Sequence, residues 1–251
     1  MHRLLILLVT ACSIPSATFH EGDVDAATTG GDAPDARRDA ATPGSDTGDA
    51  GAVAVCGNGV IELGEDCDGG SCPATCLIPS PPGSVTVRFV ATVFAVEDLT
   101  HILVPAVELG ERTWGRFVYP RNLVDTASDP KLGDYSCANP FGGYARLAVW
   151  TFHPGSTNSQ VQALDQSGAP DGVGFFTNFP VSEPAIGLLN GLSISLQDST
   201  GTAISSDALP RPPFPALSVW TERAEVRFGG EAGATRWIVV AQLDQLTFEQ
   251  N

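Results

Sequence analysis

Four cysteines crowded between residues 56 and 76 are the strongest chemical signal in this chain. They are Cys56, Cys67, Cys72 and Cys76. Thiols this close in sequence either oxidise to two disulfides or hold one tetrahedral zinc ion. The export signal at the N-terminus and the absence of a CxxC pair favour disulfides. The sequence leaves the pairing open, because four cysteines allow three connectivities.

Oxygen-bearing side chains lie among these cysteines and could bind a hard cation. The candidates are Asn58, Glu65, Asp66 and Asp68. Calcium is the ion that such oxygen ligands would take. Their spacing lacks the order of an EF-hand loop, so acidic groups solvated on a small loop are the favoured interpretation. We expect no other metal and no cofactor.

Residues 1–12 combine the parts of a bacterial export signal. Arg3 supplies a positive charge and Leu4–Val9 a short apolar core. Val9-Thr10-Ala11-Cys12 then resembles a lipobox, in which a cysteine is acylated before the signal is cleaved. The resemblance implies that residues 1–11 are a lipoprotein signal peptide and that Cys12 carries a lipid anchor. An ordinary secretory signal, with Cys12 incidental, is the alternative.

Residues 12–55 are predicted to form a disordered acidic linker. Phe19 is the only aromatic residue there, so the segment has too little apolar surface to offset the entropy cost of ordering. The whole chain has a net charge of -16, which repels phosphate backbones and excludes a nucleic-acid binder. No apolar run reaches the roughly 18 residues that a membrane-spanning helix needs. A lipid on Cys12 would therefore be the membrane contact.

Residues 56–79 resemble a known cysteine-rich family. The matching parts are Cys56-Gly57-Asn58-Gly59-Val60, Gly64-Glu65-Asp66-Cys67-Asp68 and Cys72-Pro73-Ala74-Thr75-Cys76. Together they are similar to the Myxococcus-type cysteine-rich repeat, which opens with CGNG or CGDG and closes with a cysteine pair. Leu63 stands where that family has proline, and the segment between Cys67 and Cys72 is shorter than usual. The resemblance implies a surface or secreted protein of myxobacteria or their relatives.

Apolar and polar residues alternate with a period of two through much of residues 84–251, which predicts β-strands. The expected strands are Val85–Val93, Thr113–Tyr119, Ala145–Phe152, Val173–Phe179, Leu192–Leu196, Ala224–Phe228 and Trp237–Leu243. Strands with one apolar face pack as antiparallel sheets face to face. The fold class is therefore mainly β, an antiparallel β-sandwich (jelly-roll-like) preceded by the small disulfide-rich module and the disordered N-terminal tether. This segment also resembles a broad group of uncharacterised exported bacterial β-domains, most specifically in the run Thr200–Pro210.

Catalytic patterns are missing from the sequence, and we expect no enzyme. His101 and His153 lie outside any motif, and there is no GxSxG, HExxH or phosphate-binding loop. Asp125, Asp129 and Asp134 cluster in one loop and could hold a cation, but turn-capping aspartates are the favoured interpretation. The role of Cys137, which is left over when the other cysteines are lipidated or paired, stays open between a buried inert thiol and a bridge between chains.

Two tryptophans carry the functional alternative. Trp114 and Trp220 lie near expected strand starts or loop ends, where exposed rings could stack on sugars, although core packing is the commoner fate of such rings. We therefore expect a lipid-anchored protein of the outer membrane or cell surface with a structural, adhesive or binding role. A carbohydrate-binding lipoprotein is the alternative, and an accessory subunit of a hydrolase is a weaker one. The partner would be a polysaccharide or another surface protein, and we expect the module to unfold independently of the β-domain on reduction.

Overall fold

The computed structural model describes residues 55–251 apart from residues 59–60, 69, 71, 99–100, 139–142, 154–157, 166–169, 180, 184–188 and 233–234. The signal sequence, Cys12 and the acidic linker lie outside the described residues. Ala54–Asn251 forms one compact unit, which contains both the cysteine module and the β-domain. No helix in the described part of the chain is long and apolar enough to cross a membrane.

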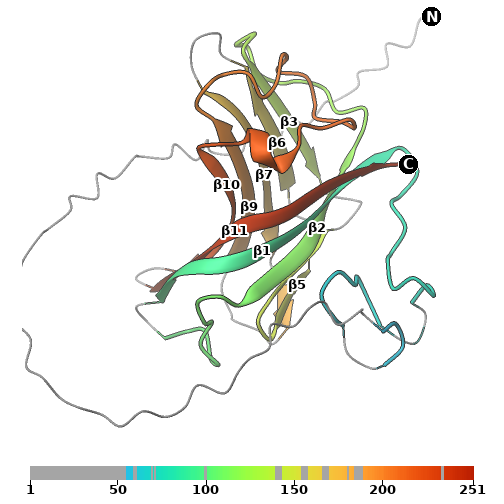
Figure 1. The fold of residues 1–251 in the computed structure, drawn as a ribbon, viewed down its shortest axis with the longest axis vertical. Helices are drawn as coiled ribbons and strands as arrows, with labels where there is room; N and C mark the ends of the chain where they lie inside the picture. The colour runs from blue at the N-terminus through green and yellow to red at the C-terminus, as the bar shows by residue number, and fades with distance from the viewer. Residues whose placement is uncertain are drawn as a thin grey trace, which may run out of the picture. The chain divides into compact units, whose positions relative to one another are not determined.

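The unit is built almost entirely from strands, as the alternation predicts (Figure 1). They are β1 (Ser84–Asp98), β2 (Arg112–Pro120), β3 (Leu132–Ala138), β4 (Tyr144–Leu147), β5 (Trp150–His153), β6 (Asn158–Leu164), β7 (Asp171–Phe179), β8 (Val181–Glu183), β9 (Leu189–Asp198), β10 (Arg223–Ala232) and β11 (Thr235–Gln250). The one helical element among the described residues is a single 3-10 turn, Leu217–Val219.

The strands form one antiparallel sheet that curls on itself. Its order is β3-β6-β7-β9-β10-β11-β1-β2-β4-β5-β8. Rings on strands that are not neighbours in this order nevertheless touch: Phe117 on β2 lies 5.6 Å from Phe175 on β7. Phe152 on β5 likewise lies 5.8 Å from Phe228 on β10. The curl thus packs the two halves of the sheet face to face, and the mainly antiparallel β prediction is confirmed.

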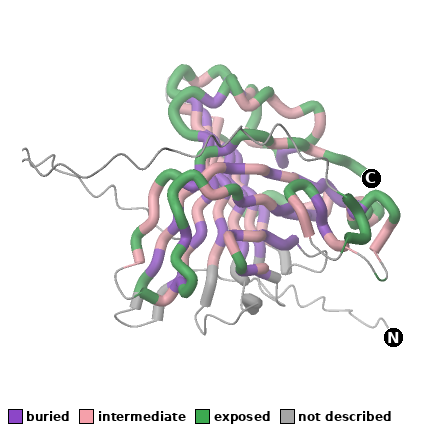
Figure 2. The backbone as a smooth tube through the Cα atoms, turned by 60° about the horizontal axis from the view of Figure 1, so that its bottom comes forward, coloured by how far each residue is buried: buried purple, intermediate pink, exposed green. Residues whose placement is uncertain are grey.

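The alternation also determines which side chains enter the core. The inward row of β1 is buried throughout: Val85, Val87, Phe89, Ala91 and Val93. Of the residues between them, Thr86 is buried, and Arg88, Val90 and Thr92 are partly exposed. Figure 2 shows this as buried positions alternating with lighter ones along the strands. The inward row of each strand therefore supplies the shared core.

One predicted strand is wrong in detail. Ala145–Phe152 is two strands, because the chain turns at Ala148, whose φ of 52° is left-handed. Leu147 and Trp150 face each other across the resulting hairpin. The alternating pattern continues through the turn, so periodicity alone did not reveal the break.

Candidate functional site

The connection between β9 and β10, residues 199–222, is the longest segment without strands in the β-domain. Asp198 holds its first turn. One carboxylate oxygen accepts hydrogen bonds from Thr200 N (3.1 Å) and Thr221 Oγ1 (3.1 Å), and the other accepts from Thr200 Oγ1 (2.6 Å) and Thr202 N (3.0 Å). The hydrogen bonds from Thr200 and Thr202 lower the pKa of Asp198 well below its usual range, so this buried carboxylate is ionised. The turn joins the end of β9 to Thr221, just before β10.

Two tyrosines hold the middle of the same connection against the sheet. The Tyr119 hydroxyl donates to the carbonyl oxygen of Pro210 (2.5 Å), and the Tyr135 hydroxyl donates to that of Asp207 (3.0 Å). Phe214 stacks on Phe248 of β11 with ring centroids 4.0 Å apart. A loop this long that is anchored by side chains at several points is more often a binding element than a simple link.

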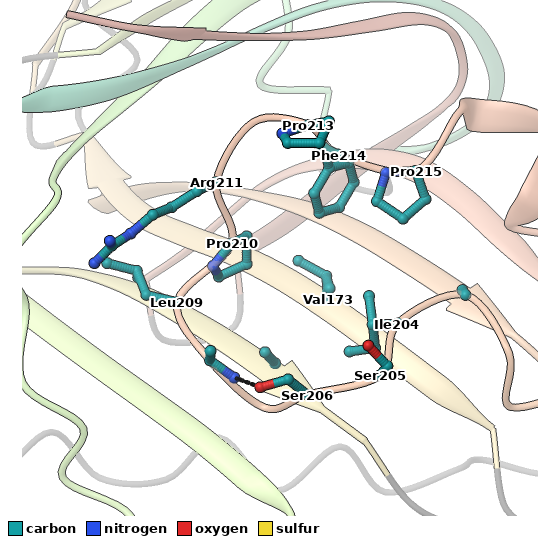
Figure 3. Close-up of a pocket in the computed structure, with 13 residues that line it drawn as sticks. Val173, Ile204, Ser205, Ser206, Leu209, Pro210, Arg211, Pro213, Phe214 and Pro215 are labelled. Carbon is teal, nitrogen blue, oxygen red and sulfur yellow. Dashed lines mark hydrogen bonds between the residues drawn. The ribbon is translucent and has the colours of Figure 1, made fainter.

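This connection covers a pocket of about 330 Å³ (Figure 3). Ala163 and Val173 come from the sheet, and the other lining residues come from the connection: Ala203, Ile204, Ser205, Ser206, Ala208, Leu209, Pro210, Arg211, Pro213, Phe214 and Pro215. A volume of this size is at the lower end of ligand-binding pockets. Most lining residues are aliphatic or proline, but polar atoms form as much of the pocket's surface as apolar atoms do, so the pocket suits a ligand with both apolar and polar groups.

The polar side chains of this pocket are few. Arg211 donates to the carbonyl oxygen of Arg121 (2.5 Å), and Ser206 Oγ accepts from Ala208 N (3.0 Å). Ser205 is exposed beside them. Among the described lining residues there is no histidine, thiol or carboxylate. The lining can therefore hold and orient a ligand, and its side-chain hydroxyl groups are those of Ser205 and Ser206.

A second site lies where the cysteine module contacts the outer side of β1, β2 and β4. Asp66, whose side chain is 2% exposed, contacts two arginines. Arg88 Nη1 lies 2.5 Å from Asp66 Oδ1, and Arg116 Nη1 lies 3.2 Å from Oδ2. Arg88 and Arg116 are direct cross-strand partners on β1 and β2. Two like charges in that position repel, and Asp66 offsets the repulsion.

The two arginines of this cluster have pKa values that are shifted in opposite directions. Burial and the charge of Arg88 lower the pKa of Arg116, opposed by Asp66. The pKa of Arg88 is raised. Burial acts to lower it, but the hydrogen bonds and charges of Asp66 and Glu249 together outweigh that effect. Arg88 Nε contacts Glu249 Oε1 at 3.0 Å. Arg88 is thus the more strongly paired of the two guanidinium groups.

Further contacts bind the module to the sheet. The Tyr144 hydroxyl donates to the Glu65 carbonyl oxygen at 2.5 Å, and Trp114 Nε1 donates to the same oxygen at 3.3 Å. Arg146 donates to the Ile61 carbonyl oxygen (3.2 Å), and its guanidinium lies over the Trp114 ring at 5.4 Å. A cavity of about 190 Å³ remains beside Asp66 and Trp114. The module is therefore packed on the sheet by buried polar groups.

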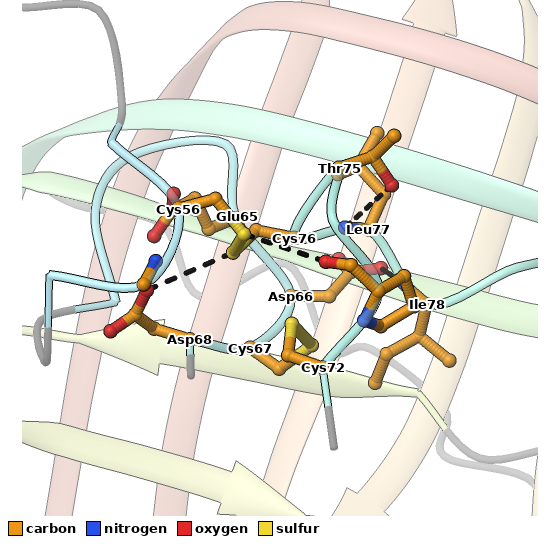
Figure 4. Close-up of a disulfide and its surroundings, with 12 residues drawn as sticks. Cys56, Glu65, Asp66, Cys67, Asp68, Cys72, Thr75, Cys76, Leu77 and Ile78 are labelled. Atoms are coloured by element: carbon orange, nitrogen blue, oxygen red, sulfur yellow. Dashed lines mark hydrogen bonds between the residues drawn. A yellow bond between two sulfur atoms is a disulfide. The ribbon is translucent and has the colours of Figure 1, made fainter. Parts of the chain in front are cut away.

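The four cysteines form two disulfides inside the module (Figure 4). Cys56 pairs with Cys76, and Cys67 pairs with Cys72. Although three of these sulfur atoms lie close enough together to hold a metal ion, sulfur in a disulfide is not the thiolate that zinc requires. The structure therefore settles the pairing that the sequence left open.

The four candidate calcium ligands have different surroundings. Asp66 is committed to Arg88 and Arg116, and it also accepts from Ile78 N (2.7 Å). Glu65 and Asp68 do lie near each other, but Glu65 accepts from Glu62 N (2.9 Å) and Asp68 accepts from Gly57 N. Asn58 is exposed. Asp66 is thus paired with the arginines, and calcium binding by Asn58, Glu65, Asp66 and Asp68 stays a prediction.

The two tryptophans are not an exposed stacking surface. Trp220 is only 4% exposed and stacks on Phe214, and Trp114 lies half-buried beneath Arg146 and the module. Trp150 and Trp237 are core residues. Core packing, the commoner fate of such rings, is thus what Trp220 shows, and its exposed alternative is wrong. Trp114 is partly covered, and its contact with sugar stays a prediction.

The remaining predicted residues lie apart from these sites. Cys137 is on β3 opposite Ser159, but its side chain lies outside the described residues, as does that of His153. His101 is exposed. Asp125 accepts from Ala127 N and Asp134 N, both at 2.9 Å, which is a turn-capping arrangement.

Sequence reasoning missed Arg88, Arg116 and Arg146. Each occupies a polar position of an alternating strand, where a solvated charge is the ordinary interpretation. Only the cross-strand register places Arg88 beside Arg116. Comparisons with protein-family models, curated proteins and solved structures find no match. The functional argument therefore depends on the geometry of the two sites.

Proposed function

We propose that this chain is an exported, lipid-anchored surface protein whose β-domain binds a partner without catalysis. The observation that carries the binding role is the pocket under residues 199–222, whose cover is held in place at several points. A preformed pocket lined by mostly apolar side chains with a few polar groups is the usual form of a binding site. The two disulfides support an oxidising compartment outside the cytoplasm.

The anchor is tested at Cys12. Cys12→Ala removes the residue that would carry every acyl chain, so the protein should move from the membrane fraction to the soluble fraction. Fractionation followed by detection of the chain measures this. Ser13→Ala is the matched control and should stay with the membrane. A Cys12→Ala protein that still needs detergent for release would contradict the anchor.

The favoured occupant of the pocket is a short, partly apolar segment of another surface protein. Ile204, Leu209 and Pro213 offer aliphatic contact to such a segment, and Ser205 offers it a hydroxyl. A polysaccharide usually needs an open aromatic face, but Phe214, the aromatic residue of the lining, stacks on both Phe248 and Trp220. The contacts around the pocket thus favour a protein partner over the carbohydrate alternative.

The binding proposal is tested by filling the pocket. Ser205→Trp places a large side chain on an exposed lining residue, and Ser218→Trp places the same side chain on the same connection outside the lining. The full chain and both variants are probed on an array of surface-protein peptides and on a polysaccharide array.

We expect peptide binding that Ser205→Trp weakens at least about tenfold, which corresponds to 1.4 kcal/mol, and that Ser218→Trp leaves intact. Polysaccharide binding with the same dependence would support the carbohydrate alternative instead. Binding that both variants keep, or no binding on either array, would rule out the pocket as the recognition site.

A further inference from the structure

Two buried aspartates lie side by side at the start of β7 and the end of β9, next to the connection of residues 199–222. Asp171 is 0% exposed and Asp198 is 1% exposed. They are direct cross-strand partners, and each follows the inward row of its strand, which continues with Val173 and Leu196. Directly opposed residues place their Cβ atoms about 4.5–5.5 Å apart. The two carboxyl groups therefore share one water-poor space.

Neither carboxyl group has a cationic partner. Among the described residues, no arginine, lysine or histidine forms an ion pair with Asp171 or Asp198. Asp198 accepts hydrogen bonds from Thr200, Thr202 and Thr221, all of them neutral donors. Two buried, directly opposed carboxyl groups are costly to ionise together unless something positive joins them.

Asp171 carries the second observation. Its Oδ2 accepts a hydrogen bond from Ile204 N (3.0 Å), but its buried Oδ1 has no hydrogen-bond partner among the described residues. Oδ1 is thus a buried polar atom that is free for a further contact. A cation at Oδ1 satisfies this oxygen and neutralises the pair.

We propose that Asp171 and Asp198 bind one calcium ion between β7, β9 and the first turn of residues 199–222. Both aspartates supply carboxylate oxygens, and the hydroxyl groups of Thr200, Thr202 and Thr221 can rotate to offer lone pairs. Calcium accepts such irregular sets of oxygen ligands, whereas magnesium needs regular octahedral geometry and sheds its waters reluctantly. The site is separate from the acidic residues of the cysteine module, and it does not depend on the proposed binding role.

The ion would stabilise the cover of the pocket. The N–H of Ile204 donates to Asp171, and Ile204 lines the pocket. Val173, two residues after Asp171 on β7, lines it as well (Figure 3). Calcium bound only by the folded chain raises its stability through mass action. At a free concentration one hundred times the Kd, the Tm of a domain of this size should rise by about 5–10 °C.

The test is thermal unfolding of the full chain in calcium and in EGTA, with native mass spectrometry to count bound ions. We expect one EGTA-sensitive calcium per chain and the stated rise in Tm. Asp171→Asn should abolish the rise, and in EGTA its Tm should equal or exceed that of the unchanged chain, because the repulsion is relieved. If Asp171 only stabilised the fold and bound no ion, Asp171→Asn would have a lower Tm in EGTA than the unchanged chain.

Two acid-to-amide controls locate the ion. Asp129→Asn alters an exposed loop, and Asp68→Asn alters the cysteine module, so both should keep the calcium-dependent rise. Thr221→Val removes one hydroxyl group at an exposed position and is the substitute variant if Asp171→Asn does not fold. It should raise about tenfold the calcium concentration at which half of the rise in Tm is reached. No rise in the unchanged chain, or a rise that survives Asp171→Asn or is lost in Asp68→Asn, would overturn the proposal.

Discussion

At the scale of single residues, Asp66 has the largest structural consequence. One carboxylate contacts Arg88 and Arg116 and accepts hydrogen bonds from Ile78 N and the Tyr144 hydroxyl. A buried ion pair is weak evidence for stability relative to an apolar core, but removing one partner leaves the others buried without compensation. The junction between module and sheet therefore depends on this one side chain.

Asp66→Ala should lower the free energy of unfolding by about 3–5 kcal/mol, the range found when one partner of a buried ion pair is removed. Denaturant unfolding of the oxidised chain measures the loss. Asp129→Ala, at an exposed position, should cost less than about 1 kcal/mol. A loss in Asp66→Ala no larger than that of Asp129→Ala would contradict a stabilising role for the cluster.

The tyrosines predict an alkaline limit to stability. Burial raises the pKa of Tyr119, Tyr135 and Tyr144, the chain's three tyrosines, above the ordinary value of about 10. Because the folded pKa exceeds the unfolded one, their contribution to stability is complete below about pH 10 and falls as the pH rises above it. Absorbance of the phenolate and circular dichroism should therefore change together in one alkaline step. Phenolate absorbance that rises near pH 10 in a folded chain would contradict the burial.

At the scale of elements, tyrosine hydroxyls attach two strandless segments to the same sheet. Tyr119 on β2 holds Pro210 of the connection, and Tyr144 on β4 holds Glu65 of the module. Gly133 on β3 lets the connection approach the sheet where the Tyr135 hydroxyl donates to the Asp207 carbonyl oxygen, because a Cβ at Gly133 would collide with that oxygen. Each segment is therefore positioned by strand residues that lie far from it in sequence.

Tyr119→Phe and Tyr144→Phe are matched variants that should loosen different segments. Tyr119→Phe removes the hydroxyl donor of the Pro210 carbonyl, at a cost of about 1–3 kcal/mol. Tyr144→Phe removes the shorter of two hydrogen bonds to the Glu65 carbonyl and leaves the one from Trp114, so its cost should lie at the lower end of that range. Hydrogen exchange should accelerate around residues 207–214 in Tyr119→Phe and around residues 65–78 in Tyr144→Phe. Exchange that accelerates in both segments in either variant would mean that the two attachments are not separate.

At the scale of the whole molecule, the cysteine module and the β-domain form one compact unit. The expectation of independent unfolding treated the module as a separate body, but its buried groups face the outer side of β1, β2 and β4. Two disulfides restrict the module, and buried polar contacts connect it to the sheet, so loss of the module's structure would also remove contacts from the sheet. We now expect reduction to affect both.

The full chain should unfold in a single transition when oxidised, and reduction should move that transition for module and sheet together. Removing the Cys56–Cys76 disulfide, with sequence separation 20, should cost about 1 kcal/mol more than removing Cys67–Cys72, with separation 5, because the longer loop restricts the unfolded chain more. Serine pairs at each bridge, followed by denaturant unfolding, test this. If reduction left the unfolding transition of the sheet unchanged, the cysteine module and the β-domain would be independent after all.

The sequence by itself determined the features that depend on neighbours along the chain. The alternation of β1 from Val85 to Val93 predicted both its strand and its buried face, because a strand turns successive side chains to opposite sides. The cysteine-rich segment was equally legible. Its pairing was not, because several pairings suit the same spacing.

Only the tertiary structure decided what depends on register and on contacts between distant segments. Arg88 and Arg116 become one charged site through cross-strand pairing, and Asp66 reaches them only because the module folds onto that face. Trp220 looked exposed beside a loop, yet the loop itself packs on the sheet and buries the ring. Asp171 and Asp198 also meet only across two strands. A local pattern carries no information about such meetings, since side-chain periodicity says which face a residue takes and not what will cover that face.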